Sequence, residues 1–293
     1  MSAASAETVP RLTWSNVSRL IRLPSQTGTW LLMLPTLWAL VLASRGLPPW
    51  RLLMIFMLGS FLMRSAGVVL NDLADRSFDR HVARTRRRPL ASGDLTALHA
   101  LFVLTVLLTL AAILVLQLNT LTIALSPVAI VLAALYPLAK RVMPLPQAVL
   151  GIAFGWGTIM AWSASRGTIE PTAWLTFAAT MCWAIAYDTI YALQDMEDDR
   201  RIGVESSALY FGPHAWLAVG MAAALMLLLL GIGAGMVGIG GTAYAMLTAV
   251  GIFFAKQVNE LRKPVGSARA FELFHQHVWA GTAILFGLVL GFL

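Results

Sequence analysis

The chain has 293 residues, of which 58% are hydrophobic and 12% are charged, and its formal net charge is +7. Soluble chains are on average about half apolar and a quarter charged, so this composition excludes an ordinary soluble domain. The single cysteine, Cys182, excludes an intramolecular disulfide. The positive charge does not indicate nucleic-acid binding, because it is spread over loops between long apolar segments.

Apolar runs long enough to cross a bilayer recur along the whole chain. They predict an all-α polytopic membrane protein, a bundle of about nine transmembrane helices with no separate soluble domain. We divide the chain into an N-terminal tail, residues 1–27, and a single transmembrane domain, residues 28–293. The predicted spans cover residues 28–45, 52–70, 97–116, 119–138, 146–164, 171–190, 214–232, 236–255 and 277–293.

The N-terminal tail contains an amphipathic stretch at residues 11–23. Trp14, Val17 and Ile21 would share one face of a helix there. That pattern favours a helix lying on the membrane surface over an ordinary polar tail.

Basic residues are distributed unevenly between the two sides of the predicted membrane. Of the 21 Lys and Arg residues, 17 lie in the tail and in the loops on its side of the membrane. The opposite side has only Arg45, Arg51 and Arg166, and Arg64 lies within a span. Since cytoplasmic loops are enriched in Lys and Arg, we expect the basic side to face the cytoplasm.

Two acidic clusters follow directly on predicted spans, and both lie on the basic side. Asn71, Asp75 and Asp79 are four residues apart, so they share one face if the span continues as a helix. Carboxylates at a bilayer boundary are costly and usually functional. Brought together, the clusters would hold Mg²⁺ and, through it, phosphate oxygens; the alternative is a pair of solvated acidic loops. The second cluster places on one face Asp188, Tyr191, Asp195 and Asp199.

Arg64 lies seven residues before Asn71 and about 10 Å deeper along a helix. A guanidinium at that depth needs an anion. We expect it to hold a carboxylate or phosphate of a ligand, or else to form a structural ion pair with one of the aspartates. Other basic residues on the same side are candidate diphosphate contacts or topology determinants. The candidates for substrate binding are Arg64, Arg22, Arg84, Arg88, Lys140 and Arg141.

The motifs around these residues resemble those of a known family. Residues 71–79 (NDLADRSFD) and 84–90 (RTRRRPL) resemble the first signature of the UbiA family of intramembrane aromatic prenyltransferases. Residues 187–204 (YDTIYALQDMEDDRRIGV) are similar to its second signature. Residues 136–147 and 155–157 make the chain most similar to bacterial members that prenylate 4-hydroxybenzoate.

This resemblance implies a helical bundle around a central cavity open to lipid. It implies Mg²⁺-dependent transfer of a polyprenyl group from polyprenyl diphosphate to 4-hydroxybenzoate, ortho to the hydroxyl, in ubiquinone biosynthesis. The expected partners are these two substrates and membrane lipid, with no nucleic acid, and the expected location is the bacterial inner membrane.

The resemblance also suggests roles for individual residues. Asp188 would orient or deprotonate the phenol or stabilise an allylic cation, and Arg64 or Arg141 would hold the benzoate carboxylate. Together with Tyr191, Asp188 and Arg64 are the catalytic candidates. The candidate metal ligands are Asn71, Asp75, Asp195 and Asp199, with Asp79 and Asp198 assisting.

The chain departs from the family pattern before the first span. Family members usually carry an acidic-basic-proline stretch there, whereas this chain has Pro24-Ser25-Gln26, with Gly28 and Thr29 retained. Other readings of the chain are prenyl transfer to a naphthoate, homogentisate or tetrapyrrole acceptor, and a Mg²⁺-binding transporter. A CDP-alcohol phosphatidyltransferase is disfavoured because its Asp-Gly-x-x-Ala-Arg core is absent.

Overall fold

The computed structural model describes residues 10–80, 85–139, 145–202 and 206–293, without the side chains of Glu197, Asp198 and Ile202. Within these ranges all regular secondary structure is helical. The long helices are α2 (Thr27–Ser44), α3 (Trp50–Ala74), α6 (Ala97–Val115), α7 (Thr120–Ala139), α8 (Pro146–Arg166), α9 (Pro171–Ile202), α11 (Ala215–Met236), α12 (Gly241–Glu260) and α13 (Ser267–Leu290). The short ones are α1 (Trp14–Leu20), α4 (Arg76–Asp79), α5 (Pro89–Ser92), α10 (Ser207–Phe211) and the 3₁₀ helix η1 (Gly212–His214).

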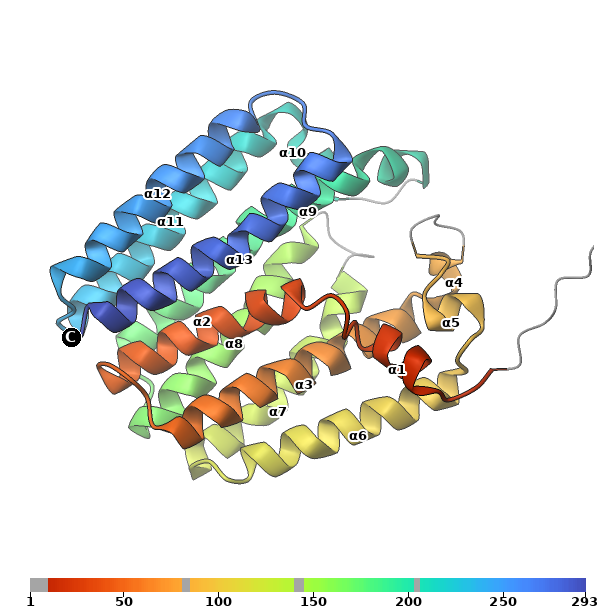
Figure 1. Cartoon of the computed structure of the whole chain (residues 1–293), viewed down its shortest axis with the longest axis horizontal. Helices are drawn as coiled ribbons and strands as arrows, with labels where there is room; N and C mark the ends of the chain where they lie inside the picture. The colour runs from red at the N-terminus through yellow and green to blue at the C-terminus, as the bar shows by residue number, and fades with distance from the viewer. Residues whose placement is uncertain (1–9, 81–84, 140–144, 203–205) are drawn as a thin grey trace, which may run out of the picture.

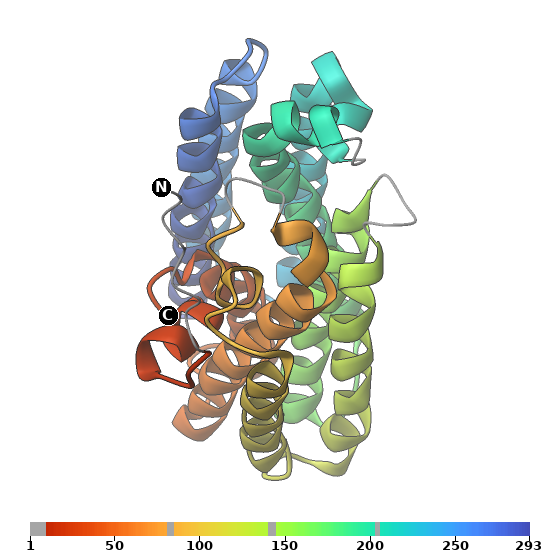
Figure 2. The ribbon, with the colours of Figure 1, turned by 90° about the vertical axis from the view of Figure 1, so that its right-hand side faces the viewer.

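The long helices run side by side in one bundle (Figure 1). The short helices α1, α4 and α5 lie together at one end of it, the end that faces the viewer in Figure 2. Helix α4 contains the last residue of the first acidic cluster, so the fold places the N-terminal helix α1 next to that cluster.

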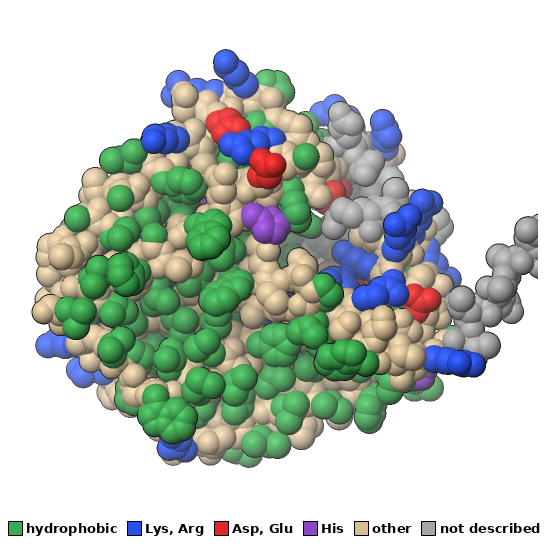
Figure 3. Space-filling model, in the orientation of Figure 1, with side chains coloured by type: hydrophobic (Ala, Val, Ile, Leu, Met, Phe, Trp, Pro, Cys, Tyr) green, Lys and Arg blue, Asp and Glu red, His purple; other side chains and the backbone are tan. Residues whose placement is uncertain are grey.

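The surface of the bundle suits a hydrocarbon surrounding. Large apolar side chains are exposed on most long helices, for example Leu98 and Phe102 of α6, Ile130 of α7 and Leu228 of α11. Figure 3 shows apolar side chains over most of one face, with charged side chains mainly along its margins. In water, exposing so much apolar surface would be unfavourable. In a bilayer the same side chains would contact lipid tails, which are equally apolar.

The prediction of an all-α membrane protein is confirmed. Seven of the long helices are long and apolar enough to cross a membrane. One of these seven spans, Ser207–Met236, includes the short helices α10 and η1 together with α11. The two others, α9 and α12, carry more polar residues, so the number of nine crossings stays a prediction. The predicted boundaries differ most at α13, which begins ten residues before the predicted start of its span, and at α9, which continues twelve residues beyond its predicted end. In both cases the charged extension forms helix without being apolar.

Helices α2, α9 and α13 are joined through tryptophans. The indole Nε1 of Trp38 donates to the carbonyl oxygen of Gly281 on α13 at 3.0 Å. The ring of Trp38 lies 4.9 Å from that of Trp183 on α9, centroid to centroid. A Cβ at Gly281 would come within 2.6 Å of the Trp183 ring, so only glycine permits this approach. Burying two aromatic rings while satisfying an indole N–H stabilises the centre of the bundle.

Proline inside α7 is accommodated by a side-chain hydrogen bond. Pro127 has no N–H to donate to the carbonyl of Ile123, four residues earlier. The hydroxyl of Ser126 donates to that carbonyl instead, at 2.8 Å. Because no water is available inside a bilayer, this side-chain hydrogen bond keeps the carbonyl of Ile123 paired.

Helix α3 does not continue through the first acidic cluster. It ends at Ala74, and Asp75, with φ −93° and ψ 2°, separates it from α4. The helix is therefore interrupted at Asp75, although the backbone N–H groups of Asp75 and Asp79 still donate to the carbonyls of Asn71 and Asp75, four residues earlier. By contrast, α9 runs without a break through residues 188–199, as the second cluster requires.

A close contact between α8 and α9 gives a test of the packing. A Cβ at Gly151 would lie 2.9 Å from the Cα of Met181, so Gly151→Ala must push the two helices apart. We expect the substitution to cost about 1–3 kcal/mol and to lower the thermal unfolding temperature in detergent micelles. Gly59→Ala is the control, because a Cβ there meets nothing within 4 Å. Equal unfolding temperatures for both variants would contradict the observed packing.

Candidate active site

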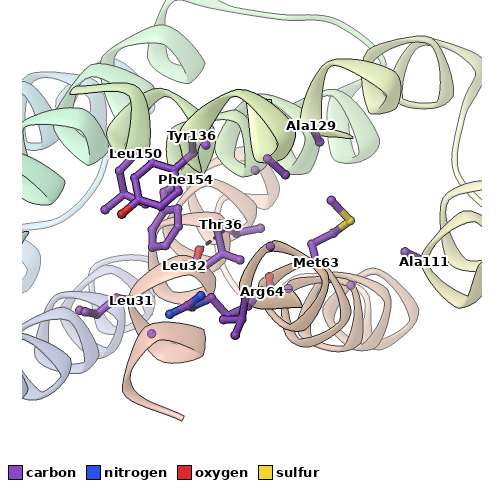
Figure 4. A pocket seen from close by; sticks show the side chains of 18 of the residues that line it. Leu31, Leu32, Thr36, Met63, Arg64, Ala111, Ala129, Tyr136, Leu150 and Phe154 are labelled. Atoms are coloured by element: carbon purple, nitrogen blue, oxygen red, sulfur yellow. Dashed lines mark hydrogen bonds between the residues drawn. The ribbon is translucent and has the colours of Figure 1, made fainter. Parts of the chain in front are cut away.

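A cavity of about 830 Å³ opens between α2, α3, α7, α8 and α9 and receives side chains from both acidic clusters. Figure 4 shows part of its wall, with Arg64 reaching from α3 toward α2 and Tyr136 on the facing helix. At one end the lining is polar, and toward α6 and the start of α7 it becomes apolar. The candidate residues that line this cavity are Arg22, Arg64, Asn71, Arg88, Asp188 and Tyr191.

Arg64 and Asp188 bring opposite charges to the cavity, and they are not paired with each other. Within the described ranges, no hydrogen bond or ion pair is formed by the guanidinium of Arg64 or by the carboxylate of Asp188. The alternative of a structural ion pair between Arg64 and an aspartate is therefore not found in this part of the chain. As far as the described residues are concerned, both groups are free to bind a ligand.

Two further polar atoms at the cavity are buried and have no hydrogen-bond partner among the described residues. They are the hydroxyl oxygen of Tyr187 and the side-chain oxygen Oε1 of Gln194, both on α9. Leaving such an atom unsatisfied costs about 1–3 kcal/mol, and native proteins accept few of them. Their position indicates a site that a polar ligand or a cation completes.

At the polar end, Asp72 holds two arginines. Its carboxylate is 1% exposed and accepts two hydrogen bonds from Nη2 of Arg22, each 2.9 Å long. It also accepts from Nη1 of Arg88 at 3.2 Å, and the same nitrogen donates to Asp79 at 2.8 Å. The network brings together segments from α3, α4 and the N-terminal tail, and it aims two guanidinium groups at one end of the cavity.

The conformation of the N-terminal segment places Arg22 at the polar end of the cavity. Helix α1 begins at the cap Thr13, whose hydroxyl accepts from the backbone N–H of Asn16. Arg22 then adopts the left-handed backbone conformation at φ 58°, which is unfavourable for a residue with a side chain. Arg19 fixes the segment to the next loop through Asp94, at 3.0 Å. A helix thus lies within residues 11–23; its position on a membrane surface stays a prediction.

The remaining candidates lie in different places. Asp75 is buried at the end of α3, and Asp79 is buried against Arg88. Asp195 and Asp199 are half-buried on α9, beyond the part of that helix that lines the cavity. Outside the described residues are Arg84, Lys140 and Arg141, together with the side chain of Asp198.

The donor atoms suit a hard divalent cation. Within the described ranges, no three His, Cys, Asp or Glu residues are grouped closely enough to hold a metal ion. The side chains of the two clusters nevertheless supply carboxylate and amide oxygens, which Mg²⁺ prefers. The partnerless oxygen of Gln194 lies on the cavity wall next to Asp195 in sequence, and Asn71 lines the same cavity from α3. The residues present therefore fit such an ion.

Sequence reasoning did not single out Asp72, Tyr187 or Gln194 as site residues. Asp72 and Tyr187 are adjacent to chosen candidates, and nothing in their spacing shows which neighbour points inward. The sequence separation between Asp72 and Arg22, fifty residues, also hides their pairing.

Comparison with known proteins shows the family of this chain. The model of the UbiA prenyltransferase family matches residues 32–279. The chain belongs to the UbiA prenyltransferase family. The 4-hydroxybenzoate octaprenyltransferase of Pectobacterium carotovorum is 45% identical over 95% of this chain and 96% of its own length. The protein of the same name from Cronobacter sakazakii is 44% identical over 94% of each chain.

Solved structures of UbiA proteins share the fold. The apo structure of a UbiA homologue from Aeropyrum pernix superimposes with a TM-score of 0.77 and 26% identity, covering 90% of this chain and 98% of that one. A UbiA homologue from Archaeoglobus fulgidus, bound to GPP and Mg²⁺, gives a TM-score of 0.69 at 16% identity, with 94% and 99% covered. At that identity the likeness to the second structure concerns the fold alone.

The buried ion pair of this UbiA protein gives a second test. Asp72→Asn removes the charge that faces Arg22 and Arg88 while keeping the shape of the side chain. We expect a loss of stability of about 3 kcal/mol, because two partly buried guanidinium groups lose the buried counter-charge that they share. The matched control is Glu260→Gln, which weakens an exposed ion pair with Arg269 and should change little. Thermal unfolding in detergent micelles measures both, and equal shifts would argue against a structural network at Asp72.

Proposed function

We propose that this protein transfers a polyprenyl group from polyprenyl diphosphate to 4-hydroxybenzoate, with Mg²⁺, at the cavity described above. The observation that carries the proposal is that Arg64 and Asp188, neither of them with a hydrogen-bond or ion-pair partner among the described residues, line one largely apolar cavity. A carboxylate and a phenol on one ring are the groups that a cation and an anion so placed would recognise. The names of the relatives and the GPP and Mg²⁺ bound to the Archaeoglobus protein support the same assignment.

The diphosphate would bind at the polar end of the cavity. Arg22 and Arg88 line that end, and a guanidinium can form two parallel hydrogen bonds to phosphate oxygens. Arg84 is a further candidate from the same loop. The apolar lining from α6 and α7 would receive the isoprenoid tail, which is chemically similar to the lipid outside.

The bound cation would be held by Asn71, Asp75, Asp195 and Asp199, with Asp79 and Asp198 nearby in sequence. Mg²⁺ there would neutralise the negative charge that develops on the departing diphosphate. Each ligand type is an oxygen donor, as this ion requires.

The acceptor would lie deeper, between Arg64 and Asp188. Arg64 would hold its carboxylate, and Asp188 would accept a hydrogen bond from its phenol and so enrich the ring with electrons. The allylic C–O bond breaks, its electron pair leaving with the diphosphate. The ring carbon ortho to the hydroxyl then bonds the allylic carbon, and the proton that this carbon releases would pass to the departed diphosphate. The apolar wall excludes water from the cation, and the ring of Tyr191 would stabilise it.

The charge asymmetry supports a placement in the bacterial inner membrane with the polar end of the bundle toward the cytoplasm. Both the soluble acceptor and Mg²⁺ would then enter from the cytoplasm. Residues 28–293 would form one transmembrane domain, and residues 1–27 a tail that contributes Arg22 to its polar end.

Metal dependence tests the proposed reaction. Purified protein in lipid vesicles is supplied with labelled 4-hydroxybenzoate and a polyprenyl diphosphate, and lipophilic product is measured. We expect product with Mg²⁺, none with EDTA, and recovery when Mg²⁺ is restored, because carboxylates alone repel a diphosphate. Asp75→Ala and Asp195→Ala should each lower turnover at least about a thousandfold.

Glu272→Gln serves as the control for these variants, since the side chain of Glu272 is exposed, bonds Arg269 and does not itself line the cavity. Product formed equally well in EDTA would contradict the metal site. Product formed only from a naphthoate or another acceptor would keep prenyl transfer and replace the acceptor.

Topology can be tested by labelling single cysteines in a variant without Cys182. Ser92 is exposed at the polar end of the bundle, and Thr120 is exposed at the start of α7, at the other end. We expect Ser92→Cys to resist an impermeant thiol reagent in intact cells and Thr120→Cys to react. The opposite pattern would reverse the orientation, and with it the side from which the acceptor enters.

A further inference from the structure

Arg64 reaches the cavity by lying against the first turn of α2, at Gly28. A Cβ built on Gly28 would fall 2.5 Å from Nε of Arg64, 2.6 Å from Nη2 and 2.9 Å from Cζ. No real Cβ approaches atoms so closely. The guanidinium therefore occupies space that exists only because residue 28 has no side chain.

The atoms that a Cβ at Gly28 would meet belong to the end of the flexible Arg64 side chain. This decides whether a substitution there moves a side chain or a helix. At Gly151 the obstructing atom is backbone, so the helices themselves must move. At Gly28 the guanidinium can swing aside with little cost to the fold, and alanine is the better helix former. A methyl group at Gly28 would thus displace the cation and leave the bundle intact.

The surroundings make this position of Arg64 specific for an anion. The guanidinium lies at the N-terminal end of α2, where the helix dipole is positive. The helix end adds positive charge, and no described carboxylate forms a hydrogen bond or ion pair with Arg64, so an anion bound there would be stabilised. A carboxylate held there can reach a planar guanidinium with two hydrogen bonds, provided that the guanidinium keeps its orientation.

We propose that Gly28 is a positioning residue, which fixes Arg64 in the orientation that recognises the acceptor carboxylate. This inference rests on the proposed function only in taking 4-hydroxybenzoate as the acceptor. Because no turnover is needed to test it, binding and catalysis can be measured separately.

The experiment measures saturation binding of labelled 4-hydroxybenzoate to the purified full-length protein without a prenyl donor. We expect Gly28→Ala to weaken binding about tenfold or more, as does Arg64→Gln, because charge-assisted hydrogen bonds are lost. The decisive variant combines both changes. If Gly28 acts through Arg64, then Gly28→Ala adds nothing in the Arg64→Gln background.

Gly67→Ala is the matched control. Gly67 lies on α3 one turn from Arg64 and lines the same cavity. A Cβ added there would have no neighbouring atom within 4 Å. Its binding constant should equal that of the wild type. A second control ligand is phenol, which lacks the carboxylate and should bind the wild type and all four variants with similar affinity.

Three results would overturn the inference. Unchanged binding in Gly28→Ala would show that Arg64 does not depend on the gap, and a loss that persists in the double variant would show a general distortion. Absence of specific binding to the wild type would remove the acceptor from this position. Failure of the proposed function looks different, since labelled acceptor would bind as expected while no prenylated product forms with donor and Mg²⁺.

Discussion

A charged side chain inside a membrane bundle has no water to solvate it, so each one needs a counter-charge or a ligand. This constraint organises the polar end of the protein. Asp72 is almost fully buried and is matched by Arg22 and Arg88, while Arg88 is shared with Asp79. Such a network is not strongly stabilising by itself, since desolvation offsets most of the attraction. Its value is that it holds segments distant in sequence in one arrangement.

The same constraint distinguishes two classes of arginine. Arg22 and Arg88 have protein counter-charges, so they can be present before any ligand arrives and can share their remaining N–H groups with a diphosphate. Arg64 has no such partner in the described part of the chain, and its side chain lines the cavity. In the proposed reaction, Arg22 and Arg88 would bind the diphosphate substrate next to the metal site, and Arg64 would bind the smaller aromatic acid. The order of substrates along the cavity follows from the order of these charges.

The sequence was sufficient for the features that depend on composition and on local spacing. The helical membrane class, the place of the long helices and the uninterrupted face at Asp188 and Tyr191 follow from apolar length and helix periodicity. The break at Asp75 does not, because a continuous helix would satisfy the same spacing. The pairing of Asp72 with Arg22 and Arg88 also could not be found, since the partners lie 50 and 16 residues away and only the fold decides which carboxylate turns inward.

The glycines show why packing carries information that residue type alone lacks. Gly151 and Gly281 permit helices to approach, and what a methyl group would meet there is a backbone atom or an indole ring already fixed by its neighbours. Gly28 permits a side chain to cross a helix, and what a methyl group would meet is a mobile guanidinium. The first kind of contact resists substitution through the energy of the whole bundle. At the second kind of contact only one side chain has to move, so a substitution changes the position of one charge and leaves the bundle in place. A glycine in an early turn of a helix can therefore belong to the binding site without contacting any ligand.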